Sequence, residues 1–256
     1  MPRVAVLKGG RSLERQVSLR SGARVEEALE RLGHGVEPID VGGDLVDRLT
    51  AAEPDIAFVA LHGRDGEDGT IQELLEVMGI PYTGSGVSAC IRAADKVLAK
   101  HAMRDQGIPT PDFYAFNETA FREPGAAQAL PAIEERLQFP IVEAVPVAQG
   151  EDDFYDFESR YEIGRTKFVC PADLADPVAE RAHDLAVAVY ELMGCSGFAR
   201  VDLMLESATD ELYVLETNPI PGLTETSLLP QAADAAGIGF DELIGLIVEA
   251  AAPVRA

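Results

Sequence analysis

The sequence contains no tryptophan, only three cysteines, and fewer than half as many basic as acidic residues. Cys90, Cys170 and Cys195 lie far apart, which excludes a disulfide framework and a zinc site and favours a reducing compartment. The 21 basic and 44 acidic side chains leave a net charge of −23, which argues against nucleic acid and anionic membranes as partners. Long apolar runs and a signal-peptide core are also missing, so we expect a cytoplasmic protein.

The composition is otherwise that of an ordinary globular protein. Apolar residues make up 47% and charged residues 25% of a 256-residue chain, which can bury a core without disulfides or metals. Short apolar runs at 4–7, 35–39 and 56–61 alternate with helical patterns and predict a parallel sheet covered by helices. Ligands bind beyond the carboxyl ends of such strands, where Gly9 and His62 fall.

Helical periodicity recurs along the rest of the chain. It predicts helices at about 25–32, 95–106, 126–137, 178–193 and 240–251. The last of these carries a single apolar stripe, so it should pack one face against a core.

Two apolar segments separated by a polar turn near Thr209 predict a β-hairpin. A turn at that position places Asp202 opposite Glu216. It also places Arg200 opposite Asn218 on the same face of the hairpin. Two carboxylates and a carboxamide oxygen at this spacing suit magnesium. A solvated face with a cross-strand pair of arginine and acid explains the same pattern.

Three further segments either bind anions or simply begin helices. Ser227 precedes a helix that starts near Leu228 and can cap it, and the N–H groups of that helix suit a carboxylate. Residues 9–15, which include Glu14, lead from a strand into a helix but match no nucleotide fingerprint. Lys96, at the start of another helix, is ambiguous in the same way.

Taken together, these segments resemble the D-alanine–D-alanine ligase family, ATP-grasp enzymes of bacterial cell-wall synthesis. The matching segments lie in the family's order and span nearly the whole chain: 9–18, 60–70, 81–86, 95–96, 154–161, 200–202 and 216–224. The resemblance implies an α/β fold in three parts. These are an N-terminal, Rossmann-like parallel-sheet (pre-ATP-grasp) domain over 1–93, a remnant of the central subdomain over 94–142 and a C-terminal ATP-grasp lobe over 143–256.

The resemblance also implies the reaction, ATP-dependent ligation of two D-alanines to D-alanyl-D-alanine for peptidoglycan synthesis through an acyl phosphate. Glu14 would orient the amino group of the first D-alanine, with His62 nearby. Arg200 and the Gly222 backbone would stabilise the oxyanion of the tetrahedral intermediate. A homodimer formed through the N-terminal domain is implied as well.

The remaining implied roles concern the second substrate and the nucleotide. Ser227 and Leu228 would hold the carboxylate of the second D-alanine. Tyr155 and Tyr161 would belong to the loop that closes over the site, and Tyr161 favours D-alanine over D-lactate or D-serine. Two magnesium ions, or manganese in their place, would bridge the ATP phosphates, and Lys96 would contact those phosphates. The implied metal ligands are Asp202, Glu216 and Asn218.

The chain departs from the family near Pro140. A family strand that resembles residues 139–142 runs into Val-Lys-Pro and a loop rich in serine and glycine over the phosphates. Here it continues directly into residues 143–146, which resemble the strand before the closing loop. Most of the central subdomain is therefore missing, together with its adenine-holding residues. An in-frame deletion is the simplest account, and an incomplete or edited sequence explains the junction equally well.

Two other functions fit parts of the pattern. A catalytically impaired, ligase-like module would bind D-alanine and magnesium but ATP only weakly, because no apolar slot would hold the adenine. A magnesium-dependent phosphohydrolase would use the acidic hairpin cluster with His62 as the base. No feature of the sequence positions a water for that reaction, so it ranks last.

Overall fold

The computed structural model describes residues 1–113 and 169–251. Stretches Met1–Pro109 and Cys170–Ala256 form one compact unit. The helix expected at 126–137, the residues around Pro140, and Tyr155 and Tyr161 all lie outside the described residues, so expectations for them stay predictions. Among the helices of the described residues, none combines the length and apolar character needed to cross a bilayer.

The elements follow the order that the sequence predicts. The first part comprises β1 (Arg3–Lys8), α1 (Arg15–Arg31), β2 (Gly35–Asp40), α2 (Leu45–Ala52), β3 (Ile56–Val59), α3 (Thr70–Met78), α4 (Val87–Ala94) and α5 (Lys96–Asp105). The second part comprises α9 (Asp176–Met193), β4 (Arg200–Glu206), β5 (Glu211–Asn218), α10 (Leu228–Ala235) and α11 (Phe240–Glu249).

The N-terminal strands form the predicted parallel sheet, in the order β2-β1-β3. Alternation along β1 divides its side chains between two cores. Val4 and Val6 pack with residues of α1 and α11, whereas Ala5 and Leu7 pack with residues of α2 and α3. Both faces of the sheet are covered, as is usual for parallel sheets.

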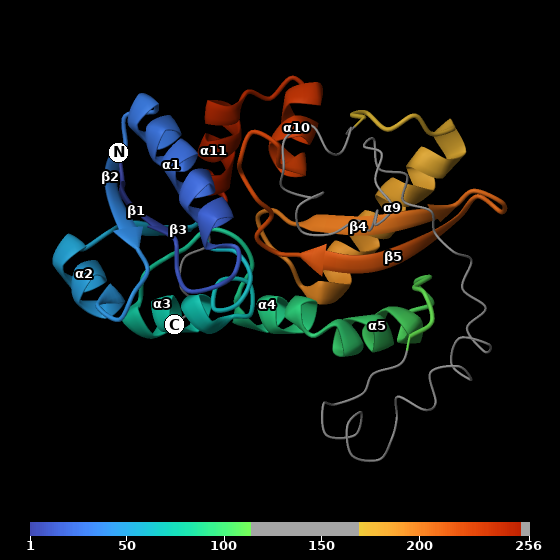
Figure 1. Ribbon diagram of the computed structural model, residues 1–256, viewed down its shortest axis with the longest axis horizontal. Coiled ribbons are helices and arrows are strands. Elements are labelled where there is room, and N and C mark those ends of the chain that lie inside the picture. Colours follow the sequence, from blue (N-terminus) through green and yellow to red (C-terminus); the bar gives the residue numbers. More distant parts are fainter. Residues whose placement is uncertain (114–168, 252–256) are drawn as a thin grey trace, which may run out of the picture. The chain divides into compact units, whose positions relative to one another are not determined.

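Helix α11, from the far end of the chain, completes the first of these cores. It lies beside α1 (Figure 1), and Arg31 of α1 bonds both carboxylate oxygens of Asp241, at 2.7 and 2.8 Å. The apolar stripe predicted for this helix is confirmed by its buried residues Leu243, Ile244, Ile247 and Val248. Helix α11 is therefore part of the N-terminal core.

The hairpin of β4 and β5 has the predicted pairing, Asp202 opposite Glu216 and Arg200 opposite Asn218. This register depends on an irregularity between Asp202 and Leu203, a β-bulge that the sequence analysis did not predict. At the turn, the pairing begins with Glu206 opposite Glu211, and continued evenly it would bring Leu215 opposite Asp202. The bulge restores Glu216 to that place.

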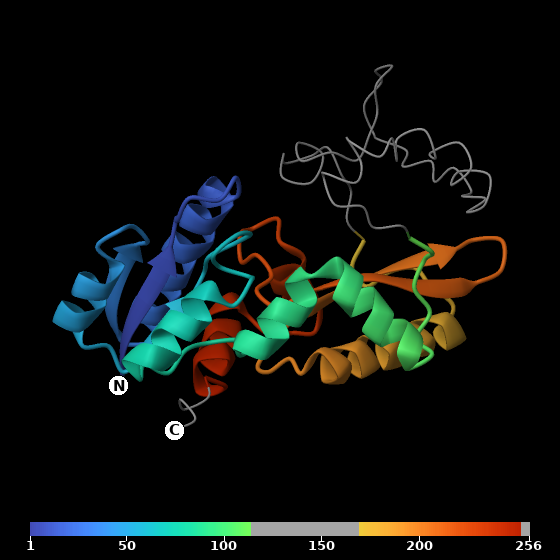
Figure 2. The same cartoon turned by 90° about the horizontal axis from the view of Figure 1, so that it is seen from below.

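One side of the hairpin packs on α9 and α5 (Figure 2). Val214 of β5 is buried there against Val189 and Met193 of α9 and Ala99 and Met103 of α5. The hairpin thus rests on a core of its own, which leaves its polar residues at the strand ends for other contacts.

Truncation of Leu29 tests the N-terminal core. Leu29 lies on α1 and is fully buried in the core that α11 completes, so Leu29→Ala should cost about 2–5 kcal/mol of unfolding free energy through lost burial and a cavity. Leu246→Ala is the control, because Leu246 is helical but 47% exposed, and it should cost less than about 0.5 kcal/mol. Urea unfolding measures both, and equal losses would contradict the packing described.

Candidate active site

The loops that follow β1 and β3 meet at the carboxyl edge of the sheet. Ser12 donates a hydrogen bond from Oγ to the carbonyl of His62, at 2.7 Å, and accepts one from the Glu14 N–H, at 3.0 Å. Gly63 has φ +68°, and a Cβ added there would lie 3.0 Å from Glu14 Oε2. The Glu14 carboxylate therefore lies beside the His62–Gly63 turn, so these two candidate residues are brought together.

An ion pair ties the same two loops at their outer side. Arg11 donates two hydrogen bonds to Asp65, at 2.6 and 3.2 Å. These bonds hold the pKa of the Asp65 carboxyl below its usual range. Because the Arg11 side chain is largely exposed, this pair adds little to stability.

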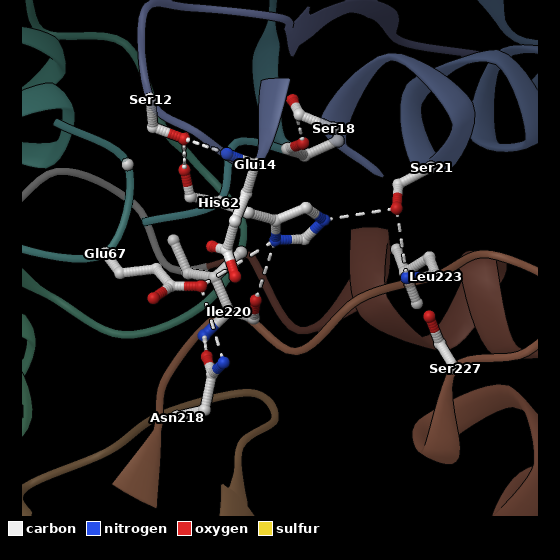
Figure 3. A network of polar contacts seen from close by, with 12 residues as sticks. Ser12, Glu14, Ser18, Ser21, His62, Glu67, Asn218, Ile220, Leu223 and Ser227 are labelled. Carbon is white, nitrogen blue, oxygen red and sulfur yellow. Dashed lines mark hydrogen bonds and ion pairs between the residues drawn. The ribbon is translucent and has the colours of Figure 1, made fainter. Parts of the chain in front are cut away.

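His62 is 5% exposed and both of its ring nitrogens have partners (Figure 3). Nδ1 lies 3.2 Å from the carbonyl oxygen of Ile220 and 3.8 Å from Glu67 Oε1. Nε2 lies 3.1 Å from Ser21 Oγ on α1. The ring therefore connects the end of the sheet with α1 and with the segment that follows β5.

That segment, residues 218–227, is held by polar groups at several points. Asn218 accepts a hydrogen bond from the Ile220 N–H, at 2.8 Å, and its amide donates to Glu67 Oε1, at 3.3 Å (Figure 3). Leu223 is held at both ends of its backbone by α1. Its N–H donates to Ser21 Oγ at 3.2 Å, and its carbonyl accepts from Arg24 Nη1 at 2.6 Å.

Gly222 lies directly beside the hydroxyl of Ser227. A Cβ added to it would lie 2.7 Å from Ser227 Oγ and 4.0 Å from His62 Nε2. Gly222, Ser227 and His62 are thus immediate neighbours, although His62 is far from the other two in sequence. A Cβ at Gly222 would displace the Ser227 hydroxyl, which is bonded to Thr224.

The expectation that Ser227 caps α10 with its side chain is wrong. Ser227 is the N-cap residue, but its hydroxyl makes no bond to the helix. Instead it accepts from the Thr224 N–H at 3.0 Å and contacts Thr224 Oγ1 at 2.8 Å. The turn of the preceding segment presents the Thr224 N–H to the hydroxyl, so Ser227 braces that turn while the partly exposed Leu228 begins the helix.

Two acidic residues of the hairpin, Asp202 and Glu216, are paired with cationic side chains. Arg200 bonds Asp202 through Nε and Nη2, at 2.6 and 2.9 Å, along one strand and not across the hairpin. Lys96, the first residue of α5, forms an ion pair with Glu216. Both carboxylates are about one quarter exposed. The structure thus joins four of the predicted residues in two ion pairs, Arg200 with Asp202 and Lys96 with Glu216.

These carboxylates suit a bound cation in charge and position. Asp202 and Glu216 are opposite one another, and each attracts a cationic side chain, which shows that the local field favours positive charge. Within the described residues, no group of three or more His, Cys, Asp or Glu side chains is arranged to hold a metal ion. A divalent cation here would need further ligands, such as an amide oxygen, water or phosphate.

Three residues of this site were not predicted from the sequence: Ser21, Arg24 and Glu67. Ser21 carried a signal, because it interrupts the buried face of α1 at a position between Val17 and Val25. A polar residue at a core position of a helix indicates a specific partner. Arg24 and Glu67 carried no comparable signal, since charged residues in helices and loops are common.

Comparisons with known proteins agree with this arrangement. A family model described as the D-ala D-ala ligase N-terminus matches residues 45–85, and one described as the D-ala D-ala ligase C-terminus matches residues 142–249. A crystal structure of D-alanine–D-alanine ligase from Bacillus anthracis complexed with ATP superposes with a TM-score of 0.75 at 27% identity, and the match covers 97% of this chain and 96% of that one.

Curated relatives match along almost their whole length. The D-alanine–D-alanine ligase of Syntrophotalea carbinolica is 39% identical over 298 residues, which cover 97% of this chain and 96% of the relative. That of Carboxydothermus hydrogenoformans is 35% identical and covers 96% and 97%. The first alignment is longer than this 256-residue chain, so at least 42 of its positions (298 minus 256) have no residue here. This difference agrees with the predicted internal shortening.

Replacement of Arg24 tests how segment 218–227 is anchored. Besides its bond to Leu223, Arg24 lies 3.9 Å from the centroid of the Phe240 ring and 3.4 Å from Glu225. Arg24→Met keeps the apolar stem and should cost about 1–3 kcal/mol of unfolding free energy. Arg20→Met should cost less than about 1 kcal/mol, because Arg20 makes one exposed ion pair with Glu225, at 3.6 Å. Urea unfolding compares the two, and equal costs would argue against the anchor.

Proposed function

We propose, from the premise that this chain belongs to the D-alanine–D-alanine ligase family, that it joins two D-alanines to D-alanyl-D-alanine for peptidoglycan synthesis and cleaves ATP in doing so. The observation that carries this function is the convergence of Glu14, His62, Gly222 and Ser227, from segments far apart in the chain, on one place beside the sheet. Likeness to ligases over the whole length does not favour the impaired, weakly ATP-binding module, and no observation supports the phosphohydrolase.

The proposed chemistry has two steps. A carboxylate oxygen of the first D-alanine attacks the γ-phosphorus of ATP, and ADP leaves with the electron pair of the broken bond. The amine of the second D-alanine then attacks the carbonyl carbon of the acyl phosphate. A tetrahedral intermediate forms and then collapses as the peptide bond is made. The phosphate leaves with the C–O electron pair and takes up the proton that the amine loses, so it departs as hydrogen phosphate.

The residues of this chain would serve these steps by charge and position. The Glu14 carboxylate holds the ammonium group of the first D-alanine. Arg200 and the Gly222 N–H stabilise the developing oxyanion, and a guanidinium with five donors can do so while it keeps Asp202. Ser227 and the first amides of α10 receive the carboxylate of the second D-alanine, because a helix N-terminus favours an anion.

The nucleotide would be bound at the hairpin. Asp202 and Glu216, with the side-chain carbonyl oxygen of Asn218, would hold divalent cations. We propose that two magnesium ions bind there. Such cations neutralise phosphate charge when bound. A divalent cation bound to Glu216 would displace the Lys96 ammonium group from that carboxylate. Lys96 would then contact a phosphate oxygen of ATP instead. Tyr155 and Tyr161 in the closing loop, the homodimer and the cytoplasmic location also stay predictions.

Phosphate release from ATP tests the function. With magnesium and ATP, the purified chain should release phosphate only when D-alanine is added, with one D-alanyl-D-alanine formed per phosphate. L-alanine is the control and should give no release, because the reversed centre misplaces the ammonium group relative to Glu14. Release that is indifferent to D-alanine, or none at all, would contradict the proposal.

Replacement of Glu216 tests the metal assignment. Glu216→Ala removes one of two opposed carboxylates, so magnesium-dependent ATP binding should weaken by about tenfold or more, the loss of one charged contact. Glu211→Ala, an exposed residue at the other end of β5, is the matched control and should bind like the unaltered chain. Calorimetric titration with magnesium and with a chelator measures the difference. An unchanged effect of magnesium in Glu216→Ala would refute the assignment.

A further inference from the structure

Ser21 is a buried polar residue whose hydroxyl serves two partners. It is fully buried on α1, where an unsatisfied hydroxyl would be costly. Its oxygen lies 3.2 Å from the Leu223 nitrogen and 3.1 Å from His62 Nε2 (Figure 3). Ser21 therefore contacts two parts of the chain, the end of the sheet at His62 and the segment 218–227. The proposed function places both of them at the substrate.

The partners of His62 determine which ring nitrogen carries the proton. A backbone carbonyl can only accept a hydrogen bond, so Nδ1, which faces the Ile220 carbonyl at 3.2 Å, must be the donor. The Glu67 carboxylate, 3.8 Å from Nδ1, also attracts that proton. In the neutral ring Nε2 is then the acceptor, and the hydroxyl of Ser21 is the group that can donate to it.

The direction of each bond follows from this assignment. The Leu223 N–H donates to Ser21 Oγ, and the single hydroxyl proton of Ser21 donates to His62 Nε2. The chain of bonds from Leu223 through Ser21 and His62 to Ile220 therefore runs in one direction. In the opposite tautomer, Nδ1 would turn a lone pair toward the Ile220 carbonyl and the Glu67 carboxylate, which repel it.

We propose that Ser21 is a positioning residue of the ligase, which holds His62 as the Nδ1–H tautomer and fixes the peptide between Gly222 and Leu223. This inference rests on the proposed function. The N–H and C=O groups of a trans peptide point in opposite directions, so the bond of the Leu223 N–H to α1 turns the Gly222 carbonyl away from α1. A Cβ added to Gly222 would lie 4.0 Å from His62 Nε2, so the imidazole ring and this peptide are close neighbours. Ser21 therefore fixes the positions of both.

Ser18 provides a matched control on the same helix. It is also a fully buried serine of α1, and its hydroxyl also has two partners, the Gly9 N–H at 2.8 Å and the Ala60 carbonyl at 2.7 Å. Neither partner is His62 or part of segment 218–227. Ser18→Ala and Ser21→Ala therefore make the same chemical change at the same depth, but Ser21→Ala alone removes the donor to Nε2.

The tautomer can be measured without any substrate. In the ¹⁵N-labelled full chain, two-bond proton–nitrogen correlation spectra report which nitrogen of each of the four histidines is protonated, and His62→Gln assigns the His62 signals. We expect protonated Nδ1 and bare Nε2 in the unaltered chain and in Ser18→Ala. In Ser21→Ala the His62 signals should move toward a mixture of forms, and Ser21→Thr, which keeps the hydroxyl, should restore them.

Each outcome decides the proposal. Protonated Nε2 in the neutral ring of the unaltered chain would overturn it even if no variant folds, as would an unchanged His62 pattern in Ser21→Ala or the same change in Ser18→Ala. In the D-alanine assay, Ser21→Ala should lower kcat/KM by about tenfold, the equivalent of one net hydrogen bond, and Ser18→Ala should stay within about twofold. The expected spectra with no ligase activity in the unaltered chain would refute the proposed function and leave the Ser21–His62 contact standing.

Discussion

The packing of segment 218–227 against α1 and the end of the sheet is the constraint on which the rest of the described structure depends. Three parts of the chain, distant in sequence, bring polar groups into a buried place, where every donor needs an acceptor. His62, Ser21 and Leu223 meet this requirement with one another. The position of Gly222 and Ser227 follows from it, because both lie in the segment that these bonds hold.

Helix α11 strengthens this constraint. It buries its apolar stripe in the core beneath β1 and α1, so the chain that leaves the hairpin must pass the end of the sheet before it reaches that core. Arg24 serves both contacts, since it bonds the Leu223 carbonyl and stacks on Phe240 at the start of α11. The hydrophobic and polar contacts thus hold the same segment to the same face of α1.

Charge is arranged locally against a strongly acidic background. The chain carries a net charge of −23, which would repel phosphate, yet Arg200 and Lys96 lie at the hairpin with Asp202 and Glu216. The two cations offset much of the repulsion between the opposed carboxylates. Under the proposed function, a divalent cation would displace Lys96 from Glu216, whereas Arg200 would keep its bond to Asp202.

Periodicity determined much of this protein from the sequence alone, namely the parallel strands, α1 and α11, because apolar spacing follows directly from helix and strand geometry. The position of the turn predicted that Asp202 faces Glu216, but the observed pairing also needs the bulge. Motif order and resemblance also predicted the family. The bulge in the hairpin, the turn of the Ser227 hydroxyl toward Thr224 and the contacts of Ser21 were decided only by the tertiary structure. They depend on which backbone N–H or carbonyl from a distant segment comes within hydrogen-bonding distance, and local sequence does not encode that distance.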